Sequence, residues 1–267
     1  MSEVVKSIVL GIIQGLTEFL PVSSSGHLEL AKFFLGTQFS GSESLTMTVV
    51  LHIATALSTV YVFRREIINL IKGALRREWN EDKSFIIKII ISMIPAAFIG
   101  YFFEKQLEEL FSGKVIFVSV MLLITGTLLI FSDMAEKKEK EISRLNAFLI
   151  GIAQAIAILP GISRSGATIS TSLLLGIKKD KAAFFSFIMV LPLIFGKLAK
   201  DLIENTYNET TVSHWSLIFG FTAAFITGVI ACKWMISIVR NSRLKYFAYY
   251  CFILGAGTLI FVIANGY

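Results

Sequence analysis

The chain has 267 residues, of which 55% are hydrophobic, and its mean hydropathy is +0.73. This hydropathy excludes an ordinary soluble domain and favours an integral membrane protein. The formal net charge of +6 does not indicate nucleic-acid binding, because the basic residues lie between apolar segments, where they report membrane topology and suit anionic lipid headgroups.

Two apolar segments, residues 4–36 and 146–177, are interrupted in the middle by polar sequence that contains proline and glycine. Two half-helices that meet at a loop would produce this pattern. Irregular backbone at membrane depth survives only where it is buried in protein or lines a water-filled cavity. We therefore expect each segment to form a re-entrant helix–loop–helix hairpin.

Six other segments are largely apolar and about as long as a membrane span, which takes about 20 residues. Three follow the first hairpin and three follow the second: 45–63, 84–103, 115–132, 182–200, 214–235 and 246–264. The sequence thus predicts an all-α integral membrane protein with six transmembrane helices and two hairpins, in a single membrane domain over residues 1–267.

Lys and Arg concentrate in alternate connections between these segments. They number six, four, three and four in 64–83, 133–145, 178–181 and 233–245, but two and one in 104–114 and 200–213. Because basic loops stay in the cytoplasm, both termini are predicted to lie outside. The first hairpin then enters from the outer face and the second from the inner face.

The two halves of the chain repeat each other in order. Gly11-Ile12-x-Gln14, Ser23-x-Ser25-Gly26, Leu35-Gly36, Ala96–Ile99 and Gly126–Leu128 return as Gly151-Ile152-x-Gln154, Ser163-x-Ser165-Gly166, Leu175-Gly176, Ala223–Ile226 and Gly257–Leu259. Each half, about 1–135 and 142–267, holds one hairpin and three spans, so the second copy is expected upside down. Inverted repeats with broken helices place their site near the membrane midplane, where the breaks face each other.

The polar residues around the two breaks define the candidate site. The first region supplies Gln14, Glu18, Ser23, Ser24, Ser25 and His27, and the second supplies Gln154, Ser163, Arg164, Ser165 and Thr168. An arginine at membrane depth is costly unless it faces water or an anion, and its planar fork suits phosphate oxygens. Serine, histidine and carboxylate together are a basic set for nucleophilic transfer. The pattern indicates phosphoryl transfer on a membrane-soluble phosphate ester or pyrophosphate.

Each of these residues also has a purely structural interpretation. The serines after each proline suit helix N-caps, Glu18 suits a buried ion pair, and His27 suits interfacial packing. Arg164 could instead extend toward lipid headgroups. His52 lies in the middle of a span without polar neighbours in the sequence, which favours a structural role.

The stretches QGLTEFLPVSSSGH and LPGISRSGAT closely resemble the two signatures of the bacterial undecaprenyl-pyrophosphate phosphatase family, also known for bacitracin resistance. The first signature, Glu or Gln followed four residues later by Glu, matches Gln14 and Glu18. The second, Pro-Gly-x-Ser-Arg-Ser followed by Thr, matches Pro160, Gly161, Ser163, Arg164, Ser165 and Thr168. Some members carry Glu where this chain has Gln14, so the site has one carboxylate fewer. The likeness covers nearly the whole chain.

The resemblance implies an enzyme of the bacterial inner membrane that removes the terminal phosphate from the C55 isoprenyl pyrophosphate released during cell-wall synthesis. It also implies a divalent cation, Mg²⁺ or Ca²⁺, and a site that opens toward the periplasm. We expect Ser24 to attack phosphorus, His27 to transfer protons, and Glu18 to orient His27 or hold the cation. Phosphate oxygens would be bound by Arg164 with the remaining polar residues, Ser23, Ser25, Ser163, Ser165, Thr168, Gln14 and Gln154.

A transporter or flippase of lipid pyrophosphate is the competing interpretation. Inverted repeats and broken helices are typical of secondary transporters, and the same arginine–serine cradle would bind a lipid headgroup that is only moved. The sequence is compatible with a homodimer.

Overall fold

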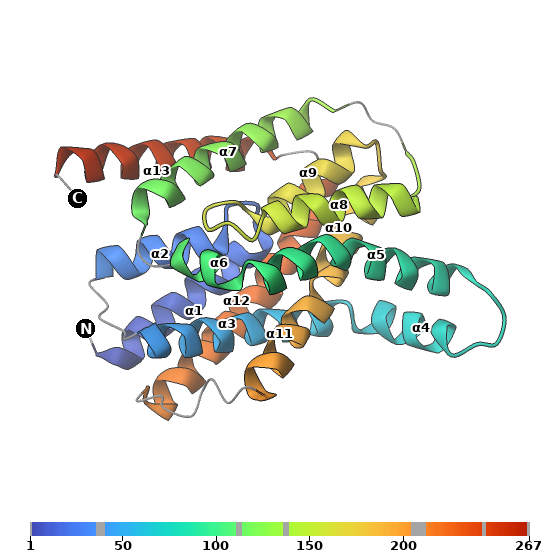
Figure 1. Cartoon of the computed structure of the whole chain (residues 1–267), viewed down its shortest axis with the longest axis horizontal. Coiled ribbons are helices and arrows are strands. Elements are labelled where there is room, and N and C mark those ends of the chain that lie inside the picture. The colour runs from blue at the N-terminus through green and yellow to red at the C-terminus, as the bar shows by residue number, and fades with distance from the viewer. Residues whose placement is uncertain are drawn as a thin grey trace.

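The computed structural model describes residues 2–35, 41–110, 114–135, 139–203, 212–241 and 244–265. These ranges contain thirteen helices and no strand beyond one isolated bridge between Lys140 and Ile177 (Figure 1). The helices are α1 (Glu3–Phe19), α2 (Ser24–Leu35), α3 (Gly41–Val62), α4 (Arg64–Ala74), α5 (Glu81–Phe102), α6 (Glu104–Leu110), α7 (Val115–Asp133), α8 (Arg144–Ile156), α9 (Arg164–Leu174), α10 (Lys179–Met189), α11 (Leu191–Ile203), α12 (His214–Arg240) and α13 (Lys245–Ala264). The expectation of an all-helical protein is confirmed.

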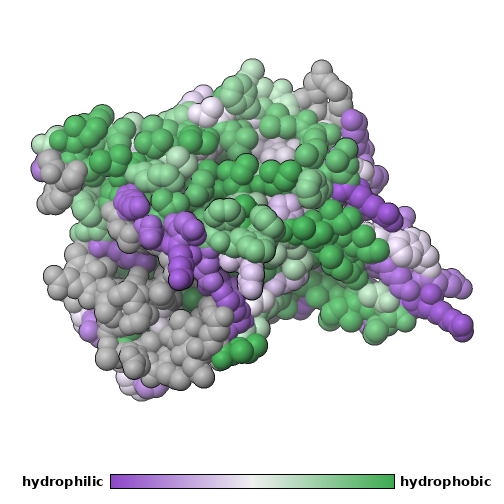
Figure 2. Space-filling view, in the orientation of Figure 1, coloured by the Kyte–Doolittle hydropathy of each residue, from purple (hydrophilic) through white to green (hydrophobic). Residues whose placement is uncertain are grey.

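Five stretches are long and apolar enough to cross a membrane: α5, α7, α10 with α11, α12 and α13. They coincide with five of the six predicted spans. The remaining one, 45–63, lies in α3, which bends by 77° into α4 and would make a sixth span if the bent pair is counted as one. The outer surface suits lipid, because hydrophobic side chains cover much of the visible face along α5, α7 and α13 (Figure 2).

Two connections contain helices that were expected only as loops. Within 64–83 lies α4, whose hydrophobic residues Ile68 and Ile71 are exposed between basic residues. Six basic and four acidic residues made this segment resemble a connection, but its apolar residues recur at helical spacing. Within 104–114 lies the short α6. The predicted span 182–200 is also divided, because α10 ends at Met189 and α11 begins at Leu191.

The two interrupted segments form helix pairs, as predicted. The first pair is α1 and α2, and the second is α8 and α9. Serines begin the second helix of each pair: Ser23 Oγ accepts a hydrogen bond from Gly26 N at 3.2 Å, and Ser163 Oγ accepts one from Gly166 N at 3.0 Å. The N-cap interpretation is therefore correct for these two serines.

The first helix of each pair, α1 or α8, packs on a long helix through small residues. Gly11 and Gly15 of α1 lie directly against the backbone of α12, and a Cβ at Gly11 would collide with the carbonyl of Gly220. Gly151, which the sequence pattern pairs with Gly11, lies against the backbone of Ser92 on α5 in the same way. Small residues allow such close approach, which is a common basis of helix association in membranes. The helix α1 is thus packed on the long helix α12, and α8 on the long helix α5.

The two loops between the paired helices touch each other. A Cβ at Gly26 would lie 3.1 Å from Gly161 Cα, and one at Gly166 would lie 3.3 Å from Pro21 Cβ. Ser165 Oγ also donates a hydrogen bond to the Leu20 carbonyl at 3.2 Å. The prediction that the two breaks meet is confirmed, and their polar residues are brought together.

Candidate active site

The carboxylate of Glu18 is the centre of the candidate site. Its Oε2 accepts hydrogen bonds from Ser24 Oγ at 2.7 Å and from Gln14 Nε2 at 3.0 Å, and its Oε1 lies 2.7 Å from Arg164 Nη2. Glu18 comes from the end of α1, Ser24 from the start of α2, and Arg164 from the start of α9. Both loops therefore contribute to one buried, charge-assisted cluster.

Arg164 is held in the protein and does not extend toward lipid headgroups. Its side chain is 15% exposed, and its second nitrogen, Nη1, donates to the Ser186 carbonyl at 3.1 Å. The hydroxyl groups of Thr168 and Ser186 lie 2.6 Å apart, which ties α9 to α10 beside the arginine. Ser186 was missed by the sequence analysis because it lies inside an apolar segment.

The flanking serines form matching pairs in the two loops. Ser23 Oγ and Ser25 Oγ lie 3.3 Å apart, and Ser163 Oγ and Ser165 Oγ lie at the same separation. Ser23 has a positive φ of 70°, which is a strained conformation for a residue with a side chain. The two loops thus share the serine pairing, with Ser24 in the middle of one and Arg164 in the middle of the other, although Ser163 has a φ of −75°.

The hydrogen-bond partners of the His27 ring are not those of the Glu18 cluster. Its Nδ1 is 2.8 Å from the Ser23 carbonyl and its Nε2 is 2.7 Å from the Tyr250 hydroxyl. The two rings are also stacked, with centroids 5.5 Å apart. Because a carbonyl only accepts, Nδ1 carries the hydrogen and Nε2 accepts from Tyr250. Tyr250 was not recognised in the sequence, where it looks like a residue at the membrane interface.

His52 has a polar neighbour after all. Its Nε2 lies 3.9 Å from Glu18 Oε2, across from α3 to α1. The expectation of a histidine without polar surroundings is therefore wrong. It failed because the neighbours of a side chain in the sequence do not reveal a carboxylate on another helix.

The two equivalent glutamines are both buried and incompletely hydrogen-bonded. Gln14 donates to Glu18, but its Oε1 has no partner among the described residues. Gln154 is 2% exposed and both of its amide atoms lack a partner in the same part of the chain. The structure thus places Gln14 in the cluster and leaves Gln154 without a contact to it.

Oxygen ligands for a cation are present, although they are few. Among the described residues no three His, Cys, Asp or Glu side chains gather in one place. Glu18 and the unpartnered Oε1 of Gln14 are nevertheless two oxygen donors on successive turns of α1. Mg²⁺ is commonly bound by one or two carboxylates together with substrate phosphates. These residues therefore fit a cation that binds together with a phosphate group.

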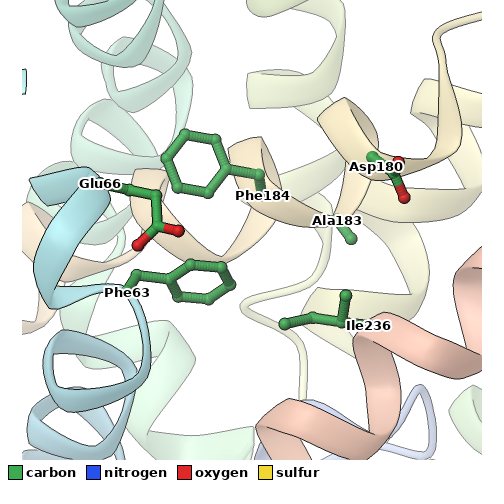
Figure 3. Close-up of a pocket in the computed structure, with 6 residues that line it drawn as sticks. All are labelled: Phe63, Glu66, Asp180, Ala183, Phe184 and Ile236. Atoms are coloured by element: carbon green, nitrogen blue, oxygen red, sulfur yellow. The ribbon is translucent and has the colours of Figure 1, made fainter.

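A separate cavity of about 210 Å³ lies beside α4 and α10 and includes none of the candidate residues. Figure 3 shows the carboxylate of Glu66 beside the rings of Phe63 and Phe184, whose centroids lie 5.3 Å apart, with Asp180 further along the wall. The chemistry expected from the sequence is concentrated instead where the two loops meet.

Comparison with known proteins gives a consistent assignment. The family model described as bacitracin resistance protein BacA matches residues 7–257. The undecaprenyl-diphosphatase of Christiangramia forsetii is 57% identical over 98% of this chain and 100% of its own length. Those of Bacteroides fragilis and Methanococcus vannielii are 46% and 40% identical, over 96% of this chain in both cases and over 97% and 100% of their own lengths. The chain therefore belongs to the BacA family of bacitracin resistance proteins.

Proposed function

We propose that the protein hydrolyses undecaprenyl diphosphate to undecaprenyl phosphate and inorganic phosphate, and so recycles the lipid carrier of cell-wall synthesis. One observation carries the proposal: Ser24 of the first loop and Arg164 of the second meet on the same carboxylate, each at 2.7 Å. A hydroxyl nucleophile, a base and an anion-binding guanidinium are thereby preassembled. The names of the full-length relatives agree with this reaction.

The reaction would take place in two balanced steps. Ser24 Oγ forms a bond to the terminal phosphorus while the anhydride P–O bond breaks, and undecaprenyl phosphate leaves. The serine proton passes to Glu18, which already accepts the Ser24 hydrogen bond. Water then attacks the phosphoserine while the P–O bond to Ser24 breaks; Glu18 returns its proton to Ser24 Oγ, and phosphate leaves with the oxygen and hydrogens of the water. His27 would assist this second proton transfer, for which its Nε2 must release the Tyr250 hydroxyl.

Arg164 would bind the non-bridging oxygens of the transferring phosphate. Preorganised charge of this kind is the main requirement of phosphoryl transfer. The hydroxyl groups of Ser163, Ser165 and Thr168, together with those of Ser23 and Ser25, would complete the cradle around it. Mg²⁺ or Ca²⁺ held by Glu18 and Gln14 Oε1 would offset the charge of the diphosphate.

The proposal includes the membrane arrangement expected from the sequence. The α1–α2 and α8–α9 pairs would be re-entrant hairpins of an inverted repeat, with six spans in the bacterial inner membrane and a site open toward the periplasm. Three observations support it: the loops touch, Gly11 and Gly151 make equivalent contacts on opposite halves, and exposed apolar side chains surround the helices.

Phosphate release from undecaprenyl diphosphate by purified protein in detergent tests the function. Arg164→Ala and Ser24→Ala should each lower kcat at least about 100-fold, the cost of removing one group that stabilises the transition state. Arg144→Ala is the matched control, because Arg144 is exposed at the start of α8. Mass spectrometry should locate a trapped phosphate on Ser24.

The same assay distinguishes a phosphatase function from a lipid-transport function. Hydrolysis in detergent needs no membrane, whereas transport does. The proposal fails if the wild-type protein releases no phosphate but moves prenyl diphosphates across vesicles, or if Arg164→Ala retains the wild-type rate.

A further inference from the structure

In its neutral form, His52 presents an acceptor nitrogen toward Glu18. The Nδ1 of its ring lies 2.8 Å from the Thr48 carbonyl, so this nitrogen carries the hydrogen. In the neutral ring, Nε2 then has its lone pair free and lies 3.9 Å from Glu18 Oε2. That separation is too long for a hydrogen bond. No hydrogen bond therefore joins His52 Nε2 to Glu18 Oε2, which accepts from Ser24 and Gln14 instead.

A third acceptor lies on the preceding turn of α1. Gln14 is fully buried, its Nε2 contacts Glu18 Oε2, and its Oε1 has no partner among the described residues. Buried polar atoms rarely remain unpaired in folded proteins. His52 Nε2 and Gln14 Oε1, on two residues that both lie next to Glu18, thus have no hydrogen-bond donor among the described residues.

The neighbourhood of His52 also matches that of a metal ligand. Histidines that bind metals usually donate their other ring N–H to a carbonyl or carboxylate, which fixes the ring. The Thr48 carbonyl accepts the other ring N–H of His52 in this way. On Glu18, Arg164 contacts Oε1, and Oε2, which accepts hydrogen bonds from Ser24 and Gln14, is the atom that lies 3.9 Å from His52 Nε2.

We propose that His52 Nε2 is a direct ligand of the divalent cation bound at Glu18 and Gln14. The inference deepens the proposed function, because the cation is the one expected to bind the diphosphate. A nitrogen ligand raises the affinity for first-row transition ions relative to Mg²⁺ and Ca²⁺, which prefer oxygen. The site therefore selects ions such as Mn²⁺ over Mg²⁺.

Electron paramagnetic resonance with Mn²⁺ tests the ligand directly, without substrate. The chain contains only three histidines, so protein prepared without a histidine tag allows each to be examined separately. Wild-type protein should bind one Mn²⁺ saturably and show electron spin-echo modulation from a coordinated ¹⁴N. In His52→Gln the modulation should disappear, and the Kd for Mn²⁺ should rise at least about 10-fold relative to the Kd for Mg²⁺.

Two matched variants make the assignment specific. His27→Gln and His214→Gln remove the other two imidazoles and should keep the ¹⁴N modulation of the bound ion. The inference is overturned if wild-type protein binds no Mn²⁺, if bound Mn²⁺ shows no nitrogen, or if the signal is lost in His27→Gln instead. An ion pair of protonated His52 with Glu18 would give the second of these results.

The outcome is independent of the test of the proposed function. Phosphate release by a protein whose Mn²⁺ has only oxygen ligands would refute the role of His52 and leave the phosphatase standing. Conversely, a nitrogen-bound Mn²⁺ in a protein that releases no phosphate would support the role of His52 as a ligand and refute the phosphatase.

Discussion

Gln14→Glu would place a second carboxylate directly against Glu18. The Gln14 amide nitrogen now lies 3.0 Å from Glu18 Oε2 and donates to it. Two unit charges at that separation repel by about 5.5 kcal/mol at an effective dielectric constant of 20. Protonating a glutamate of ordinary acidity at pH 7 costs about 4 kcal/mol and would remove this repulsion. The free energy of unfolding can therefore fall by no more than this amount.

The variant should therefore be destabilised in the presence of a chelator and recover when a divalent cation neutralises the pair. For a chain of this size the limiting loss corresponds to a fall in the apparent Tm on the order of 10 °C. Thermal unfolding in detergent, with EDTA and then with excess Mg²⁺ or Ca²⁺, measures both effects.

Gln154→Glu is the matched control for this experiment. Gln154 is buried like Gln14, but the residue four positions later is Ile158 and not a carboxylate. Its variant should lose stability that cations do not restore. Equal apparent Tm values for wild type and Gln14→Glu in EDTA, or a loss that cations leave unchanged, would refute this account of the site.

Two further substitutions test contacts around the loops. Tyr250→Phe removes the hydroxyl bonded to His27 and should change kcat and the pH profile of phosphate release while KM stays constant. Tyr249→Phe, at an exposed neighbour, should leave both kcat and the pH profile unchanged. Gly161→Ala should lower stability by about 1–3 kcal/mol, measured as apparent Tm, because φ is +98° and a Cβ would lie 2.6 Å from Met121 Cβ. Gly100→Ala, where a Cβ meets nothing within 4 Å, should not be destabilising, and an equal loss there would contradict the packing argument.

The long apolar helices and the paired broken segments could be predicted because their signals are local. Length and hydropathy define α5, α7, α12 and α13, and prolines with serines mark the two breaks. The 77° bend between α3 and α4 could not be predicted, since α4 is amphipathic and its charges resemble those of a loop.

The composition of the site was predictable only in part. Glu18, Ser24 and Arg164 were identified because polar residues beside a proline or glycine are conspicuous in an apolar sequence. His52 and Ser186 were not identified as site residues, because each lies within a largely apolar helix. Each contacts its partner, Glu18 or Arg164, on a different helix. The position of His27 next to Tyr250 likewise depends on packing between α2 and α13.

The ion pair between Glu18 and Arg164 joins residues 146 positions apart. During translation, Glu18 is therefore synthesised well before Arg164, its cationic partner. Neither half alone contains both members of this pair, although each contains its own serine-capped loop. Co-expressing the two halves as separate polypeptides should consequently restore hydrolysis in the membrane, while either fragment by itself stays inert.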